Sequence, residues 1–205
     1  YNNRSLYANN TINSKATSAS NYGIYMYYNY YTDFIHNTIR LENSLNTGYT
    51  LMGYSSSGNG FYNNILANYS AGPAYYLSSS SFDQMSNNDI YTTGSSLVYH
   101  NGTNYNNLYD WQVATNYDSF SLSTDPLFKS SSNLHVREVN LNAAAKYFKV
   151  TPLDMDYEVR DTLKPDIGAD EFNLPPNDAG ISAVIVPFKP FPPDTQNVKV
   201  VLKNH

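Results

Sequence analysis

Short stretches of alternating apolar and polar residues recur along the first half of the chain at a nearly constant interval. Residues 7–12, 34–39 and 61–66 read YANNTI, FIHNTI and FYNNIL, and each carries an asparagine at its fourth position. These residues are Asn10, Asn37 and Asn64, separated by 27 positions each time, and a fourth, weaker copy (MSNNDI) places Asn88 after 24 more. A repeat of this length indicates a solenoid, in which successive coils of chain stack on one another.

The alternation within each copy has a period of two, which is typical of a strand with one buried face. A buried amide needs hydrogen-bond partners, and a column of asparagines supplies them, because each amide can donate to one neighbour and accept from the other. We therefore expect Asn10, Asn37, Asn64 and Asn88 to form a structural ladder inside the solenoid. Aligned on these asparagines, the inward-pointing sets are expected to be Ala8/Asn10/Ile12, Ile35/Asn37/Ile39, Tyr62/Asn64/Leu66 and Ser86/Asn88/Ile90.

A second strand-like segment follows each copy, at residues 23–27, 48–52, 74–77 and 96–99. Stretches rich in Ser, Gly and Asn separate these segments from the next copy, as turns do. Two or three short strands in each coil of 24 to 27 residues describe an all-β fold, the right-handed parallel β-helix. Alternation within these segments places Tyr25, Tyr27 and Tyr76 on the outer face of the coils.

The repeat pattern ends near residue 105, and the parallel β-helix with its cap is assigned to residues 1–172. Residues 173–178 are expected to be a linker, and residues 179–205 an incomplete immunoglobulin-like β-sandwich, because two strands cannot bury a core alone. The elements expected after the repeats are a helix at 106–115, a turn into a strand at 125–128, a short strand at 133–136, a last coil at 165–172, and strands at 179–186 and 197–204.

Composition and charge exclude several classes of protein. Charged residues make up only 14% of the chain and aromatic residues 15%, with 21 tyrosines, which is unlike a disordered chain. A net charge of −5 offers no footprint for nucleic acid, and no apolar run is long enough to span a membrane. The absence of cysteine excludes disulfides and thiolate metal sites. Because the first residue, Tyr1, falls in the lead-in to a repeat, we expect the chain to be a processed or excised piece of a longer protein.

Several motifs together resemble those of a known protein family. They are the Asn-Asn-Thr-Ile tags, Trp111, Asp118 and Ser121 with DPLF at 125–128, and Arg160 with DIGADEF at 166–172. In these motifs the chain resembles secreted right-handed parallel β-helix proteins of the pectate-lyase-like fold, common in Bacteroidetes-type bacteria. Residues 178–204 resemble the opening of an Ig-like or CARDB-like module of large exported surface proteins. The resemblance implies a secreted or bacterial cell-surface location but no single reaction, because this fold hosts lyases, hydrolases, epimerases and adhesins.

Polysaccharide lyases of this fold typically use an arginine or lysine base together with Ca²⁺ held by several carboxylates. The coils show no such set, since the column of Arg40 holds Asn13, Ala67 and Tyr91. Their carboxylates fall at unmatched positions: Asp33, Glu42, Asp83 and Asp89. The two or three clustered aspartates that a hydrolase requires are missing as well. His36 lies in a column with Asn9, Asn63 and Asn87 and is expected to be a solvated surface residue.

The densest group of charges consists of Asp154, Asp156, Arg160, Asp166, Asp170 and Glu171. One interpretation is a Ca²⁺ site with Asp154, Asp156 and Asp170 as ligands. The other, which is favoured, is a capping network in which Arg160 pairs with an aspartate and no cofactor is needed.

Outward-facing tyrosines can stack on sugar rings, or can simply pack well on a pleated sheet beside their neighbours. The sequence favours a non-catalytic structural or adhesive module of a large secreted or cell-surface protein. Its expected partners are polysaccharide, contacted through Tyr25, Tyr27 and Tyr76, and further domains of the same polypeptide. The alternative is the C-terminal part of a polysaccharide lyase or glycoside hydrolase whose catalytic coils lie upstream.

Overall fold

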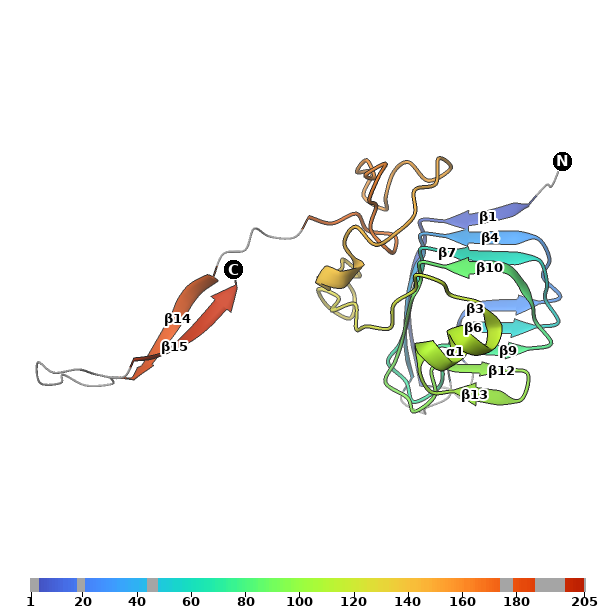
Figure 1. Cartoon of the computed structure of the whole chain (residues 1–205), viewed down its shortest axis with the longest axis horizontal. Coiled ribbons are helices and arrows are strands. Elements are labelled where there is room, and N and C mark those ends of the chain that lie inside the picture. The colour runs from blue at the N-terminus through green and yellow to red at the C-terminus, as the bar shows by residue number, and fades with distance from the viewer. Residues whose placement is uncertain (1–3, 18–20, 44–47, 174–178, 187–197, 205) are drawn as a thin grey trace, which may run out of the picture. The chain divides into compact units, whose positions relative to one another are not determined.

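The computed structural model describes residues 4–17, 21–43, 48–173, 179–186 and 198–204 (Figure 1). The chain divides into two compact units, Tyr1–Phe172 and Asn173–His205. The first unit is an all-β solenoid of about three turns with parallel sheets, which confirms the predicted architecture.

Three parallel sheets form the walls of the solenoid, and each coil contributes one strand to each sheet. The first sheet contains β1 (Ser5–Ala8), β4 (Thr32–Ile35), β7 (Asn59–Tyr62) and β10 (Phe82–Ser86). The second contains β2 (Thr11–Ala16), β5 (Thr38–Asn43), β8 (Ile65–Asn68) and β11 (Asp89–Thr92). The third contains β3 (Tyr22–Tyr27), β6 (Tyr49–Tyr54), β9 (Tyr75–Ser78) and β12 (Val98–His100), and ends with the antiparallel β13 (Thr103–Tyr105).

The sequence repeat sets the register between coils, so that like residues stack in the interior. In the second sheet Ile12, Ile39, Leu66 and Ile90 form one column. In the third sheet the inward column is Ile24, Leu51, Tyr75 and Val98. Members of both columns belong to one continuous apolar core, whose burial supplies the main driving force for stacking the coils.

The predicted inward column Ala8/Ile35/Tyr62/Ser86 is wrong. The core instead receives the preceding residue of each copy, as shown by Phe34 and Phe61, whose ring centroids lie 4.5 Å apart. Tyr62 faces outward and its ring lies 5.2 Å from that of Phe148. The reason is a corner between the first and second sheets, where one residue per coil adopts a left-handed backbone with φ between 53° and 58°: Asn9, His36, Asn63 and Asn87. This residue interrupts the two-residue alternation, and Asn tolerates the left-handed conformation better than most residues.

The predicted asparagine ladder is present and follows directly after this corner. The side-chain Nδ2 of Asn10 donates to Oδ1 of Asn37 (2.8 Å), and Asn37 Nδ2 donates to Asn64 Oδ1 (2.9 Å). Asn64 Nδ2 in turn donates to Asn88 Oδ1 (3.0 Å). Each accepting oxygen also receives the backbone N–H of the asparagine one coil earlier, as Asn64 Oδ1 does from Asn37 at 3.0 Å.

The second amide hydrogen of Asn37, Asn64 and Asn88 binds a backbone carbonyl of the coil before it, whereas that of Asn10 binds Ala8 O in its own coil. Asn64 Nδ2 donates to Phe34 O and Asn88 Nδ2 donates to Phe61 O, both at 3.0 Å. The amides of Asn64 and Asn88 are fully buried, so this pairing avoids the cost of leaving a buried polar group unsatisfied.

The carboxylate of Asp118 ends the ladder by accepting a hydrogen bond from its last asparagine, Asn88. Asp118 Oδ1 accepts from Asn88 Nδ2 (3.0 Å) and from Ser121 Oγ (2.9 Å), while its Oδ2 accepts from the indole Nε1 of Trp111 (2.8 Å). Trp111 lies on α1 (Leu108–Thr115) and belongs to the apolar core. The predicted helix is thus confirmed (α1 in Figure 1), and its tryptophan packs into the apolar core beside the end of the ladder.

Residues 122–172 cover the outer face of the second sheet. Ile65 and Ala67 of β8 are fully buried in a second apolar cluster with Phe128, Leu134, Val136, Leu141 and Ile167. Within this segment the structure contains one 3₁₀ turn (Val139–Leu141) and isolated bridges, such as Leu153 with Val159. The strand predicted to follow the turn at 125–128, the strand at 133–136 and the last coil at 165–172 are therefore wrong. This segment packs sideways onto the sheet and does not continue the stack.

The second unit contains two antiparallel strands, β14 (Ala179–Val186) and β15 (Lys199–Asn204). The two predicted strands are confirmed, whereas the β-sandwich they would begin stays a prediction. The predicted linker at 173–178 lies outside the described residues except at position 173. Within the described residues no helix has the length and apolar character needed to cross a membrane.

Replacing a central rung should destabilise the whole solenoid. Asn64→Ala removes the acceptor of two donors of Asn37, and each unsatisfied buried group costs about 1–3 kcal/mol. We expect a loss of about 3 kcal/mol or more in the free energy of unfolding, measured by urea titration. The matched control is Asn106→Ala, at an exposed position, with a change within about 0.5 kcal/mol. Equal stability of the two variants would contradict a structural role for the ladder.

Candidate functional site

A stack of tyrosines runs across the outer face of the third sheet, one from each coil. The rings of Tyr49 and Tyr76 lie 4.7 Å apart, and those of Tyr76 and Tyr99 lie 4.4 Å apart, with nearly parallel planes in both pairs. Tyr22 extends the stack at 6.0 Å from Tyr49. We call Tyr22, Tyr49, Tyr76 and Tyr99 the tyrosine stack.

The structure places the three predicted tyrosines on this face but in different environments. Tyr76 lies between Tyr49 and Tyr99, so both faces of its ring are covered and only its edge and hydroxyl group remain accessible. Tyr25 and Tyr27 of β3 are 55% and 56% exposed. Tyr25 lies against Tyr22, with ring centroids 5.4 Å apart, and Tyr27 lies against Tyr54 at 5.5 Å. Tyr25 and Tyr27 therefore offer the accessible aromatic surface.

The tyrosine stack itself was not predicted, although the sequence contains a signal for it. Tyr22, Tyr49 and Tyr76 are separated by the same 27-residue step as the asparagines. The strands β3, β6, β9 and β12 also contain no Asp, Glu, Lys or Arg. The outer face of the third sheet is thus aromatic, hydroxyl-rich and uncharged within its strands.

The first sheet gathers carboxylates that looked unmatched in the sequence. Arg4 binds both oxygens of Asp33, at 2.7 and 2.8 Å, and one oxygen of Asp83 at 2.7 Å. Hydrogen bonding to Asp33 raises the pKa of the Arg4 guanidinium, against the lowering effect of burial. A catalytic arginine base must give up its proton, and the ion pairs with Asp33 and Asp83 make this loss harder. Arg4 is therefore a structural cation of the first sheet.

Two carboxylates are buried completely and lie away from solvent. Burial raises the pKa of Asp89 to about 8, and its Oδ1 accepts the backbone N–H of Thr124 at 3.0 Å. Asp118 ends the ladder, and burial raises its pKa as well. Neither side chain is exposed to solvent, so both serve the packing of residues 116–125 against the last coil.

His36 is buried, so its predicted place on the solvated surface is wrong. Residues 143–168 cover the corner between the first two sheets, and the Nδ1 of His36 lies 3.0 Å from Gly168 O. The Nδ2 of Asn63 lies 2.8 Å from the other ring nitrogen, Nε2, and must donate to it. This pairing fixes the neutral tautomer with its proton on Nδ1. Burial, assisted by the charge of Arg160, lowers the pKa of His36 to about 3.

Residues 154–171 form a hydrogen-bonded network around Asp154 and Arg160. Asp154 accepts three backbone N–H groups, from Asp156 and Glu158 on one oxygen and from Glu171 on the other, at 2.8–2.9 Å. The guanidinium of Arg160 pairs with Glu171 at 3.1 Å and not with an aspartate. Asp154 thus uses both of its oxygens to hold the loop that carries Asp156.

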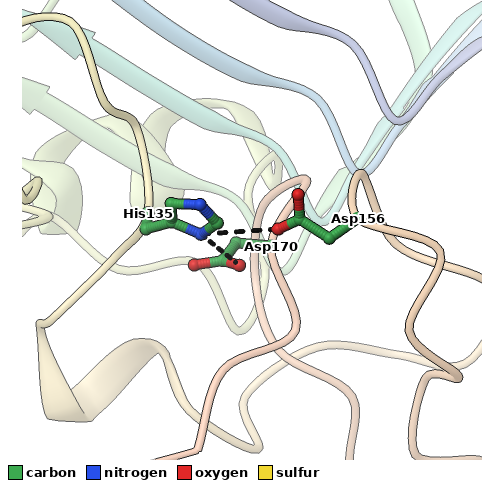
Figure 2. Close-up of side chains that lie close together, drawn as sticks. All are labelled: His135, Asp156 and Asp170. Carbon is green, nitrogen blue, oxygen red and sulfur yellow. Dashed lines mark hydrogen bonds and ion pairs between the residues drawn. The ribbon is translucent and has the colours of Figure 1, made fainter.

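A histidine completes a group of possible metal ligands in this region (Figure 2). His135 Nδ1 lies 3.0 Å from Asp170 Oδ1 and 3.5 Å from Asp156 Oδ2. Ligand atoms of the three residues all lie within 4.8 Å of one another. Two of the three predicted carboxylates, Asp156 and Asp170, are therefore brought together, and His135 is the member that sequence reasoning missed. The sequence holds no signal for this grouping, because His135 lies outside the repeats and cannot be aligned with any coil.

No family model, curated protein or solved structure matches the chain. Function must therefore be inferred from the tyrosine face, the histidine–aspartate group and the architecture that positions them.

The buried imidazole should make stability depend on pH. Its pKa is about 3 in the folded protein and ordinarily about 6.5, so below pH 6.5 the unfolded chain binds a proton that the folded one does not. The stabilisation is complete above about pH 6.5 and is lost progressively as the pH falls towards 3. His36→Asn, which places the asparagine of the neighbouring coils in this column, should remove this contribution.

Urea unfolding of the wild-type chain and of His36→Asn at pH 7, 5 and 4 measures this effect. From pH 7 to pH 4 we expect the free energy of unfolding of the wild type to fall by at least about 1 kcal/mol more than that of His36→Asn. Other titrating groups are common to both chains and cancel in the difference. A difference that is constant with pH would contradict the burial of a neutral His36.

Proposed function

We propose that the chain is a non-catalytic structural and adhesive module of a secreted or cell-surface protein, and that the outer face of its third sheet contacts polysaccharide. The observation that carries this proposal is the exposed pair Tyr25 and Tyr27 beside the tyrosine stack. Aromatic side chains combine a large apolar surface with a hydroxyl group that can form hydrogen bonds. These two properties suit the apolar faces and hydroxyl groups of sugar rings.

The chemistry of the face favours a neutral polysaccharide. An acidic polymer requires cationic partners for its carboxylates, and the strands β3, β6, β9 and β12 contain no Lys or Arg. His100, on β12, is the basic-type side chain within these strands and lies against Trp111. An uncharged glycan avoids the cost of removing charges from water on this surface.

The rest of the unit supports a role as a rigid scaffold. Paired strands at a regular spacing and a hydrogen-bonded interior ladder give a stiff wall on which the tyrosines are fixed. The two arginines described above are used in structural pairs: Arg4 with Asp33 and Asp83, and Arg160 with Glu171. Secretion and the pectate-lyase-like relationship rest on the motif resemblance, with β14 and β15 as the proposed start of an Ig-like module.

Binding to insoluble neutral polysaccharides tests the proposal. We expect the wild-type chain to co-sediment with at least one of cellulose, insoluble xylan or β-mannan. Tyr25→Ala/Tyr27→Ala should weaken this binding about tenfold or more, because each aromatic contact contributes about 0.5–1.5 kcal/mol. The control is Tyr109→Ala, an exposed tyrosine on α1, which should bind like the wild type.

Two outcomes would count against the proposal. Equal binding by the Tyr25/Tyr27 double variant and the control would remove the tyrosine face from recognition. Release of soluble sugars or of unsaturated products during incubation would favour the alternative, a polysaccharide lyase or hydrolase. Circular dichroism of each variant establishes that the fold is retained.

A further inference from the structure

We propose that His135, Asp156 and Asp170 bind a divalent transition-metal ion of the zinc type. The three side chains come from three separate parts of the segment that covers the second sheet, and Figure 2 shows them pointing toward one another. Their exposures decrease from Asp156 (50%) to His135 (29%) to Asp170 (5%). The group is therefore anchored in the protein at one side and open to solvent at the other.

The charges in this group call for a cation. Oxygens of Asp156 and Asp170 both approach the same ring nitrogen, His135 Nδ1. A neutral imidazole carries one proton and cannot serve two carboxylates fully through that nitrogen. Among the described residues, neither carboxylate has a salt bridge with Lys or Arg. A metal ion between the three groups would balance both negative charges, with His135 neutral and its proton on Nε2.

The spacing of the donor atoms fits coordination to one ion. Zinc bonds of about 2.1 Å at tetrahedral angles place neighbouring ligand atoms about 3.4 Å apart. The separations from His135 Nδ1, 3.0 Å to Asp170 and 3.5 Å to Asp156, lie on either side of this value. The ligand atoms of Asp156 and Asp170 lie within 4.8 Å of each other, so side-chain rotations that bring these two carboxylates closer would complete the coordination of one ion.

Backbone hydrogen bonds hold the three ligands in place. Asp170 Oδ2 accepts the backbone N–H of Val136 at 2.9 Å, which fixes this carboxylate beside the adjacent His135. The backbone N–H of Met155 donates to Ala169 O at 2.9 Å, and this bond joins the Asp156 loop to the Asp170 segment. Such supporting bonds orient metal ligands and raise affinity.

The donor set selects the ion. Ca²⁺ and Mg²⁺ prefer oxygen ligands, whereas imidazole is suited to zinc and its neighbours in the first transition series. The Ca²⁺ site considered from the sequence also required Asp154, whose oxygens are occupied by three backbone N–H groups. One imidazole and two carboxylates therefore point to Zn²⁺ more than to Ca²⁺.

A fourth position remains for water or for an external ligand. A solvent-open cavity of about 310 Å³ adjoins His135 and is lined by polar groups of Thr11, Asn13, Ser132 and Asn133. Structural zinc sites are normally closed by four protein ligands, while sites with three protein ligands keep an open position. The site would thus bind the metal with a water molecule facing this cavity.

Metal titration of the tag-free chain tests the inference. After treatment with a chelator, isothermal titration with Zn²⁺ should show one ion bound per chain. His135→Gln and Asp156→Asn should each weaken binding by at least about tenfold. Asp156 is half exposed and its carboxylate makes no backbone hydrogen bond among the described residues, so Asp156→Asn should fold normally.

Two matched controls remove a carboxylate close to the proposed metal site and a histidine far from it. Glu158→Gln removes an exposed carboxylate two residues from Asp156, and His100→Gln removes a histidine on β12. Both should bind Zn²⁺ like the wild type, and millimolar Ca²⁺ should not displace the ion.

Co²⁺ provides a second readout, because its visible absorption reports nitrogen ligation and low coordination number. The wild type should develop these bands and His135→Gln should not. Absence of Zn²⁺ binding, binding that His135→Gln and Asp156→Asn leave unchanged, or displacement by Ca²⁺ at equal concentration would each overturn the proposal.

Discussion

The structure depends on one repeated interaction, the hydrogen bond that the side-chain amide of an asparagine in each coil donates to the asparagine of the next coil. Asn37 and Asn64 each accept two N–H groups from the coil before and donate to the coil after. A slip of one residue between coils would leave these groups unpaired in an apolar interior. Every rung would then lose its hydrogen bonds at the same time, and each unpaired group would lower the stability of the fold. The ladder therefore specifies register, while the surrounding columns of Ile, Leu and Phe supply the hydrophobic stabilisation.

With the interior fixed, the three outer faces of the solenoid acquire different roles. The second sheet is covered by residues 122–172, which bury Ile65 and Ala67 and bring His135 beside two aspartates. The third sheet carries aromatic rings that remain exposed at Tyr25 and Tyr27. The first sheet holds the ion pairs of Arg4. Both candidate binding regions are thus consequences of which face receives the covering segment and which does not.

The sequence correctly predicts the features that repeat with the coils. Its predictions fail for features that depend on residues outside the repeat pattern. The 27-residue step is enough to derive the solenoid, the ladder and the outward direction of Tyr76, because each follows from stacking identical coils. The inward column of the first sheet was misassigned because a residue with a left-handed backbone, such as Asn63, shifts the alternation. The pattern of apolar and polar residues does not reveal that backbone angle. The burial of His36 and the grouping of His135 with Asp170 depend on how residues 122–172 fold back, for which no repeat gives a register.

Hydrogen exchange of asparagine side-chain amides, followed by nuclear magnetic resonance, tests the central claim most directly. The NH₂ groups of Asn37, Asn64 and Asn88 donate within the ladder and to buried carbonyls. They should exchange as slowly as the core backbone amides of β5 and β8, because opening a rung requires separating coils. Exchange at the rate of an exposed asparagine such as Asn106 would show that the amides face water, and would contradict a solenoid held in register by its ladder.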